Sequence, residues 1–364
     1  MGQPQIVIIG AGIAGLSLAW SLTGSGHAVT VVDAGAVGAG ASRAATAYLE
    51  PRLGSGGLRA IEWASAREWP ALADEIEAET GQSIDYRREG LIHVATPERS
   101  GELADQAAER QRRGWNARLL EPAELSELEP NLRGEVGAAL FLPDIHWLDG
   151  RRLCRALAAA IRRRGGAILE DRPVTRLVPD GGGLVAETSG DAVPASHVIV
   201  CTGAAGPQIT GLPGDIPFCR PVRGVVVSVQ SDPDAPLVNR VIKHRKGPVC
   251  PRSDGRILLG TTYERGETSS HVRPELAEQL VANAARFIPK LRDCPVTEVT
   301  TGIRALAPDG LIHIGRSREL PDVYYSLSHS GAGYLRAPVI AREFAEFIID
   351  NAAGCPLTGK YLAR

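Results

Sequence analysis

Three glycines near the amino terminus have the spacing of a loop that binds phosphate groups. Gly10, Gly12 and Gly15 follow the apolar run of residues 6–9 and open a segment with a helical pattern. In that context Gly10 permits a tight turn, Gly12 lets the backbone approach a pyrophosphate, and Gly15 lets the helix pack close to the strand. The helix amino terminus would add N–H groups and a partial positive charge for the phosphates. The sequence therefore predicts a dinucleotide-binding loop.

A carboxylate follows the next predicted strand, residues 28–32. Asp33 can accept hydrogen bonds from ribose hydroxyls and would repel a 2′-phosphate. Strand, glycine turn, helix and strand form a βαβ unit, which is the context that makes the glycine pattern specific. NAD and FAD contain the same ADP half, so the loop alone does not distinguish the two cofactors. An NAD-dependent dehydrogenase is one alternative at this point.

Three further segments have patterns that bear on the choice of cofactor. Residues 38–48 contain Gly, Ala, Ser and Thr in series, residues 198–201 form an apolar strand that ends in Thr202 and Gly203, and residues 329–338 lead into the last predicted helix. Together with Pro173-Val174 and the glycine loop, these segments resemble the D-amino-acid-oxidase-like flavoproteins, which include glycine oxidase, sarcosine oxidase and D-amino acid dehydrogenases. The resemblance covers nearly the full chain and is closest to glycine oxidase.

The resemblance implies that FAD is the cofactor. It implies noncovalent binding, because Gly302 stands where sarcosine-oxidase relatives carry the Cys that attaches their flavin. Residues 38–48 would line the pyrophosphate and the flavin edge, and residues 329–335 would lie near the pyrimidine end of the ring, where a partial positive field stabilises reduced flavin. The cofactor-binding residues expected on this basis are Gly10, Gly12, Ile13, Ala14, Gly15, Asp33, Ala34, Ala41, Ser42, Arg43, Thr46, Ala47, Tyr48, Val174, Thr202, Gly203, His329, Ser330, Gly331, Ala332, Gly333, Tyr334 and Leu335.

The segment of residues 302–315 resembles the C-terminal motif in which an Arg of the family holds the substrate carboxylate. Arg304 is the matching residue, and a guanidinium suits this task because its fork binds both carboxylate oxygens. A salt-bridged structural Arg is the alternative. Tyr48 and Tyr263 stand where glycine oxidases carry apolar residues near the flavin ring, so either could add a hydroxyl to the substrate site or narrow it.

Two departures from the glycine-oxidase pattern leave the substrate open. Pro248 stands where glycine oxidases carry a Tyr near the substrate, and Gly331 stands where they carry a second Arg. The resemblance implies oxidative deamination of a small amino acid or amine to an imine and then an oxo acid, with hydrogen peroxide if oxygen accepts the electrons. One alternative is a D-amino acid or N-methyl amino acid dehydrogenase with a quinone-type acceptor. Another is a noncatalytic flavin-bearing subunit of a complex. The flavin would carry the chemistry, and no residue is predicted to be catalytic.

The composition and the net charge limit the kinds of partner that the protein is expected to have. The 364 residues include 40 Lys and Arg against 42 Asp and Glu, a net charge of −2 that offers no field for nucleic acid. Six scattered cysteines indicate reduced thiols, and no His or Cys spacing predicts a metal site. No apolar run reaches membrane-spanning length. A cytoplasmic enzyme that acts on a small molecule is expected, and a homo-oligomer is an open alternative.

The elements that position these residues predict an α/β fold. We expect a Rossmann-like FAD-binding domain with an interleaved α+β substrate domain built on an antiparallel sheet. Residues 1–80, 145–215 and 300–364 are assigned to the FAD-binding domain, and residues 81–144 and 216–299 to the substrate domain. The patterns also predict a helix over residues 58–79, a strand over 86–95, a turn-rich segment over 121–130 and a final helix over 339–351.

Overall fold

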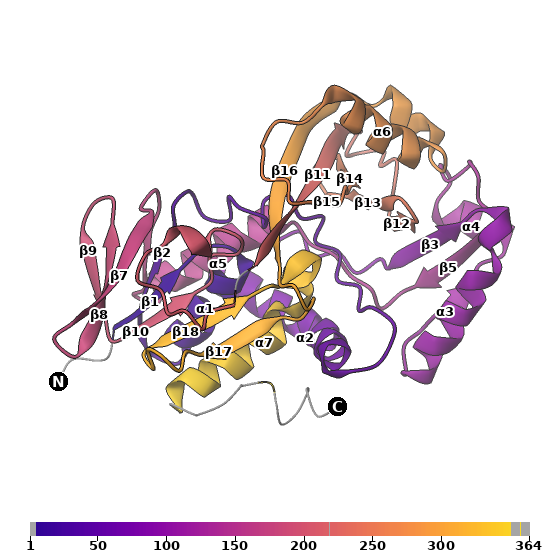
Figure 1. Ribbon diagram of the computed structural model, residues 1–364. Helices are drawn as coiled ribbons and strands as arrows, with labels where there is room; N and C mark the ends of the chain where they lie inside the picture. The colour runs from indigo at the N-terminus through magenta and orange to yellow at the C-terminus, as the bar shows by residue number, and fades with distance from the viewer. Residues whose placement is uncertain (1–4, 218, 351–356, 358–364) are drawn as a thin grey trace.

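The computed structural model describes residues 5–217, 219–350 and 357. Strands in these residues form sheets of six, nine and three strands. Figure 1 shows the three-stranded sheet at one end of the molecule and the helices α3 (Gly101–Arg112) and α4 (Pro122–Leu128) at the other. The two larger sheets lie between these ends. This arrangement confirms the predicted α/β fold.

The six-stranded sheet carries the glycine loop. Its central strand, β1, pairs in parallel with β2 and β10, and alternate residues of β1 enter different cores: Ile6 and Ile8 pack towards one face, Val7 and Ile9 towards the other. A strand buried on both faces reads as a continuous apolar run, as residues 6–9 do. The strands in sheet order are β17 (His313–Arg316), β18 (Val323–Leu327), β10 (His197–Val200), β1 (Gln5–Ile9), β2 (Ala28–Val32) and β6 (Ala167–Leu169).

Helices cover one face of this sheet and the three-stranded sheet covers the other (Figure 1). The helices pack against one another through the larger apolar core, to which β1 contributes Ile6 and Ile8. They are α1 (Ile13–Gly24), α2 (Gly57–Thr80), α5 (Gly150–Arg163) and α7 (Gly333–Ile349). The opposite face meets β7 (Val174–Asp180), β8 (Gly183–Thr188) and β9 (Ala192–Ala195).

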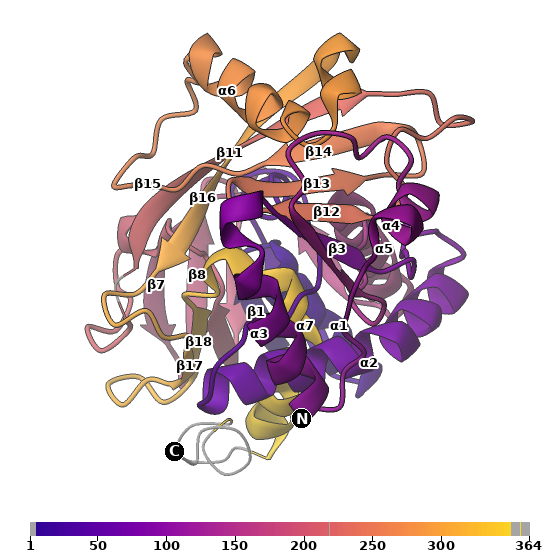
Figure 2. The same cartoon turned by 90° about the vertical axis from the view of Figure 1, so that its right-hand side faces the viewer.

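The nine-stranded sheet is mostly antiparallel and is covered by α6 (Pro274–Ala285), which lies across β11, β13 and β14 in Figure 2. Its longest pairing joins β11 to β16. The sheet order is β15 (Glu264–Arg265), β11 (Arg220–Gln230), β14 (Arg256–Gly260), β13 (Gly247–Pro251), β12 (Val241–His244), β3 (Leu91–Ala95), β5 (Ala138–Leu142) and β4 (Arg118–Leu119), with β16 (Val296–Leu306) on the other side of β11. Short 3-10 turns lie at residues 97–99, 206–208, 289–293 and 330–332.

The last helix begins six residues before the predicted start at residue 339. Pro338 lies inside the helix, and proline lacks the N–H that would bond to the carbonyl four residues earlier. That carbonyl belongs to Tyr334, and the indole Nε1 of Trp69 donates to it at 3.1 Å. A side chain from α2 therefore satisfies the group that Pro338 leaves free, and the helix continues through it. Residue 351, the predicted end, lies outside the described residues.

Two other predicted elements differ from the structure. The turn-rich segment of residues 121–130 contains α4, which starts at Pro122, where proline's fixed φ suits the first helical position. The strand predicted over residues 86–95 begins only at Leu91, because Gly90 has a φ of +89°, outside the extended region. The helix predicted over residues 58–79 is confirmed as α2.

The sheets support the proposed division into two domains. Strands of the six-stranded sheet come from residues 5–32, 167–200 and 313–327, and those of the nine-stranded sheet from 91–142 and 220–306. β16 crosses the boundary placed at residue 300, so we propose that this strand belongs to both parts. In the part of the chain that the structure describes, no helix has the length and apolarity to cross a membrane.

Candidate functional site

The glycine loop joins β1 to α1 and is shaped by close backbone contacts. Gly10 has a φ of +115°, and a Cβ placed there would lie 2.5 Å from the carbonyl oxygen of Cys201. A Cβ at Gly15 would lie 2.0 Å from the carbonyl oxygen of Gly10. Both positions therefore require glycine, and α1 starts directly over the end of β1. Its N-cap, Gly12, has no side chain that could cover the first turn.

Two side chains hold this loop in place. Asp33 accepts hydrogen bonds from the backbone N–H of Ala11 at 2.5 Å and of Gly35 at 2.9 Å. Ser42 Oγ accepts one from the N–H of Ile13 at 3.0 Å. Each carboxylate oxygen has two lone-pair directions, so Asp33 keeps acceptor capacity for a ribose. The predicted ribose contact is compatible with this geometry and stays a prediction.

A cavity of about 1,070 Å³ opens over the loop and extends to the nine-stranded sheet. This volume lies just above the usual range for ligand sites, roughly 300–1,000 Å³. Nearly all of the predicted cofactor residues line it, although they come from distant parts of the chain. They are Gly10, Gly12, Ile13, Ala14, Asp33, Ala34, Ala41, Ser42, Thr46, Ala47, Tyr48, Val174, Thr202, Gly203, His329, Ser330, Gly331, Ala332, Gly333, Tyr334 and Leu335.

Two predicted cofactor residues lie outside the lining. Gly15 packs behind the loop against Gly10, which is the packing role that the spacing suggested. The side chain of Arg43 is half exposed and pairs with Glu298 of β16 at 2.8 Å. Its backbone belongs to the lining segment, but its guanidinium is directed to the neighbouring strand.

The segment of residues 38–48, here called the second cofactor loop, packs tightly against β16. A Cβ at Gly302 would lie 2.8 Å from the Cβ of Ala44 and 3.2 Å from the Cα of Ala41. The loop and the strand therefore approach at a distance that only glycine allows. At Gly302, the part of the cavity wall formed by the second cofactor loop meets the part formed by β16.

The turn before α7 closes another side of the cavity. The hydroxyl of Tyr334 lies 3.0 Å from the carbonyl oxygens of both Ser42 and Gly150, which anchors the turn to the second loop and to α5. Burial, together with the nearby guanidinium of Arg336, lowers the pKa of His329 to about 4. His329 is therefore neutral at pH 7, and any positive field here comes from the helix and from Arg336.

The lining fits FAD. Thr202 lines the cavity, and its Oγ1 is buried without a hydrogen-bond partner among the described residues. Orphaned polar atoms of this kind are rare in native interiors, and a hydroxyl or phosphate of a bound dinucleotide would satisfy it. The glycine cradle allows a pyrophosphate to approach the amino terminus of α1 in the same cavity, where Ser42 accepts from the N–H of Ile13.

Arg304 lies on β16 and lines the end of the cavity formed by the nine-stranded sheet. Its guanidinium covers Gly224, where a Cβ would lie 2.3 Å from Nη2. Nη1 donates to the carbonyl oxygen of Thr262 at 3.2 Å and Nη2 to Oγ1 of Thr261 at 2.7 Å. These partners are neutral, and no ion pair joins Arg304 to a carboxylate in the described part of the chain. Burial lowers its pKa, yet a guanidinium stays protonated at neutral pH.

The two predicted tyrosines flank Arg304 differently. Tyr263 is exposed at the cavity mouth, with its ring centroid 5.9 Å from the guanidinium carbon of Arg304. Tyr48 lies deeper, and burial raises its pKa while the charges of Lys243 and Arg304 oppose this effect. Pro248 and Gly331, the two departures from the glycine-oxidase pattern, both line the cavity as well.

Charged residues that the sequence reasoning missed also line this end. Lys243 of β12 pairs with Glu50, and Arg52 pairs with Glu62. Glu50 and Arg52 follow the second cofactor loop directly, a position that could have drawn attention to them. Lys243 offered no such signal, because only the tertiary structure brings β12 to this loop.

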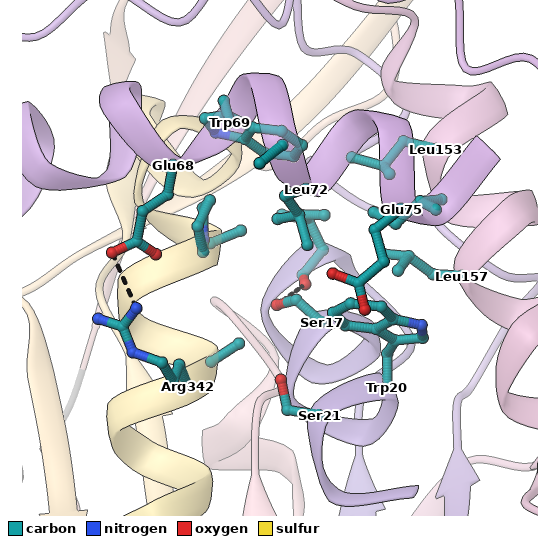
Figure 3. A pocket seen from close by; sticks show the side chains of 16 residues that line it. Ser17, Trp20, Ser21, Glu68, Trp69, Leu72, Glu75, Leu153, Leu157 and Arg342 are labelled. Atoms are coloured by element: carbon teal, nitrogen blue, oxygen red, sulfur yellow. Dashed lines mark hydrogen bonds and ion pairs between the residues drawn. The ribbon is translucent and has the colours of Figure 1, made fainter. Parts of the chain in front are cut away.

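A second cavity, of about 440 Å³, lies among α1, α2, α5 and α7 (Figure 3). Its lining is mainly apolar, and an ion pair of 2.8 Å between Glu68 and Arg342 crosses one side. Of the predicted site residues only Ile13 lines it. The larger cavity is therefore the candidate active site.

Comparison with known proteins gives the family. The sequence profile of the family described as FAD dependent oxidoreductase (DAO) matches residues 5–347. The chain is 28% identical over 354 residues to glycine oxidase from Bacillus licheniformis, covering 95% of this chain and 93% of that one. It is 25% identical over 397 residues to D-amino acid dehydrogenase 3 from Mesorhizobium japonicum, covering 91% and 94%. The crystal structure of glycine oxidase from Geobacillus kaustophilus superposes with a TM-score of 0.90 at 26% identity and 99% coverage of both chains. The chain therefore belongs to the family of FAD-dependent oxidoreductases.

Proposed function

We propose that this protein oxidises the C–N bond of a small amino acid, by the type of reaction that glycine oxidases perform. The observation that carries the proposal is Arg304, a largely buried cation in the cavity with only neutral partners among the described residues. A desolvated guanidinium without a carboxylate is costly. A substrate carboxylate would supply the missing charge and two parallel hydrogen bonds.

The residues of the chain orient the substrate for this reaction. Bound FAD supplies the acceptor for two electrons and the α-hydrogen of the neutral amine. Arg304 holds the carboxylate, and Tyr48 and Tyr263 limit the space around the adjacent carbon. The product imine reacts with water to give an oxo acid and an amine or ammonia. No side chain needs to act as an acid or a base in this scheme.

Anaerobic mixing of the purified protein with single amino acids tests the proposal. The panel contains glycine, sarcosine and D- and L-amino acids, and the absorbance of oxidised flavin is followed. We expect at least one of them to bleach the absorbance. A protein that holds FAD but is bleached by none of these amino acids would contradict the proposal and favour an amine without a carboxylate as the substrate, or a noncatalytic flavin-bearing subunit.

The electron acceptor belongs to the same proposal. Readmission of air after bleaching gives hydrogen peroxide if oxygen is the acceptor. Recovery of the oxidised flavin only with an added quinone would instead favour a dehydrogenase of D-amino acids or N-methyl amino acids. A cytoplasmic location and self-association into a homo-oligomer are further parts of the proposal, tested by cell fractionation and by light scattering.

A further inference from the structure

A second cation lies in the candidate active site, apart from Arg304. The ammonium of Lys243 lies 5.5 Å from the ring centroid of Tyr48, and Lys243 lines the same cavity as Arg304. Both charges act on the phenol of Tyr48. Tyr48 is therefore close to two cations that come from different strands, β12 and β16.

The carboxylate beside Lys243 is shared with other groups. Glu50 is buried and accepts hydrogen bonds from Arg110, which is also buried, from His93 at 2.8 Å and from Lys243. Burial lowers the pKa of His93, so its imidazole is neutral at pH 7. The single negative charge of Glu50 is therefore shared by the cations of Arg110 and Lys243. With His93 neutral, this group of four side chains has a net charge of +1.

Lys243 keeps its own charge in this cluster. Burial lowers the pKa of its ammonium, but the carboxylate of Glu50 outweighs this effect and holds that pKa above its usual value. The only hydrogen bond of Lys243 to another side chain in the described residues goes to Glu50. An ammonium has three protons to donate, so donors remain for a ligand in the cavity.

The remaining charged groups at this end add to the positive excess. Arg52 and Arg336 line the cavity and share Glu62, which also pairs with Arg59. One carboxylate again serves several guanidinium groups. A cavity whose walls carry net positive charge concentrates anions and favours a ligand with more than one negative group.

We propose that the substrate carries a second carboxylate, which Lys243 binds while Arg304 binds the first. This inference rests on the proposed function and narrows its substrate class to acidic amino acids or to amines with two carboxylate-bearing arms. Both classes of substrate have an oxidisable carbon next to the nitrogen. Both also carry two carboxylates that are separated by only a few bonds. The small uncharged residues Pro248 and Gly331 line the same cavity and bring no opposing charge.

Matched substrate pairs test the proposal on the holoenzyme. Glycine is compared with iminodiacetate, and D- and L-alanine with D- and L-aspartate, by kcat/KM and by the rate of anaerobic flavin bleaching. For at least one pair we expect the dicarboxylate to exceed its partner tenfold or more. Lys243→Met should lower this ratio at least tenfold, whereas Lys243→Arg, which keeps the charge, should retain most of it. Lys246→Met, on the exposed turn after β12, is the matched control and should leave the ratio unchanged.

A binding measurement separates this inference from the proposed function. Succinate and butyrate, which lack an amine, are titrated into the holoenzyme while the flavin spectrum is followed. We expect succinate to bind at least tenfold more tightly, and Lys243→Met to remove the preference. Tighter binding of succinate without any turnover would keep the second carboxylate site and reject amine oxidation. Equal binding of the two acids, or equal effects of Lys243→Met and Lys246→Met, would overturn the inference.

Discussion

At the scale of single residues, the substrate class follows from Arg304, whose guanidinium has no carboxylate partner among the described residues. Most arginines in the structure have a carboxylate partner, such as Arg223 with Glu264 and Arg256 with Asp149. Arg304 instead donates to a backbone carbonyl and to a hydroxyl. The sequence left open the alternative that Arg304 is a structural residue in a salt bridge. Among the described residues, Arg304 forms no salt bridge.

Replacing Arg304 tests its role directly. We expect Arg304→Met to lower kcat/KM for an amino acid by roughly 30-fold to 1,000-fold, which corresponds to about 2–4 kcal/mol for a lost charged contact. Arg304→Lys should recover part of this loss, because it keeps the charge without the planar fork. Steady-state kinetics provide the measurement.

Arg265→Met is the control for this variant. Arg265 is exposed, lies 5.8 Å from the ring of Tyr263 and does not line the cavity. Its replacement should leave kcat/KM close to the wild-type value. Comparable losses in Arg304→Met and Arg265→Met would argue against a specific carboxylate contact.

At the scale of elements, a buried ionic cluster connects the helices α2 and α7. Glu62 of α2 is fully buried and accepts hydrogen bonds at 3.1 and 2.6 Å from the guanidinium of Arg336 of α7, which is 2% exposed. Arg336 also donates to the carbonyl oxygen of His329 at 3.1 Å. The cluster thereby fixes the turn that lines the cofactor cavity.

Removing the charge of Glu62 should destabilise the protein strongly. Burial raises the pKa of Glu62, but hydrogen bonds from Arg52 and Arg336 outweigh this effect, so the carboxylate is charged at neutral pH. Glu62→Gln would leave a buried guanidinium without a counter-charge. We expect the free energy of unfolding to fall by about 3–5 kcal/mol, measured by urea denaturation with FAD in excess.

A surface pair between the same two helices provides the control. Glu68 of α2 and Arg342 of α7 lie 2.8 Å apart and are both more than one-third exposed (Figure 3). Solvent screens such pairs, so Glu68→Gln should cost less than about 1 kcal/mol. Losses of similar size in the two variants would show that burial does not determine the strength of the Glu62 cluster.

At the scale of the whole molecule, the cofactor cavity takes its walls from both large sheets. The loop after β1 and the turn before α7 contribute one side, and β11, β12 and β16 contribute the other. A ligand that contacts both sheets stabilises their relative arrangement, because binding to the native state alone adds to the free energy of unfolding.

Removal of FAD should therefore lower the thermal stability. At a hundredfold excess over its dissociation constant, FAD adds about 2.7 kcal/mol, so we expect the melting temperature of the apoprotein to lie several degrees lower. FAD should restore it, whereas FMN, which lacks the ADP half that the glycine loop would bind, should restore less. Differential scanning calorimetry provides the measurement.

The same preparation tests the noncovalent attachment. Because Gly302 has no side chain and packs against Ala41 and Ala44, we expect acid precipitation to release all of the flavin into the supernatant. Yellow colour that stays with the precipitated protein would refute noncovalent binding. Equal restoration by FAD and FMN would refute the predicted role of the glycine loop.

Local sequence was sufficient for the features that depend on neighbouring residues. The glycine spacing and the apolar run of residues 6–9 predicted the βαβ unit, because a doubly buried strand and a tight turn leave direct marks in the sequence. The resemblance of short motifs to a known family extended this to the cofactor residues, of which nearly all line one cavity. The same resemblance predicted Arg304 as the residue that binds the substrate carboxylate, and Arg304 lines this cavity.

The tertiary structure decided what depends on residues that are distant in the chain. The helix α7 runs through Pro338, and Trp69 from another helix satisfies the carbonyl that the proline leaves free. Lys243 became a candidate for substrate binding because β12 pairs in parallel with β3 and lies next to the loop that carries Glu50. No local pattern encodes such a contact, since its free energy arises from charges that only folding brings together.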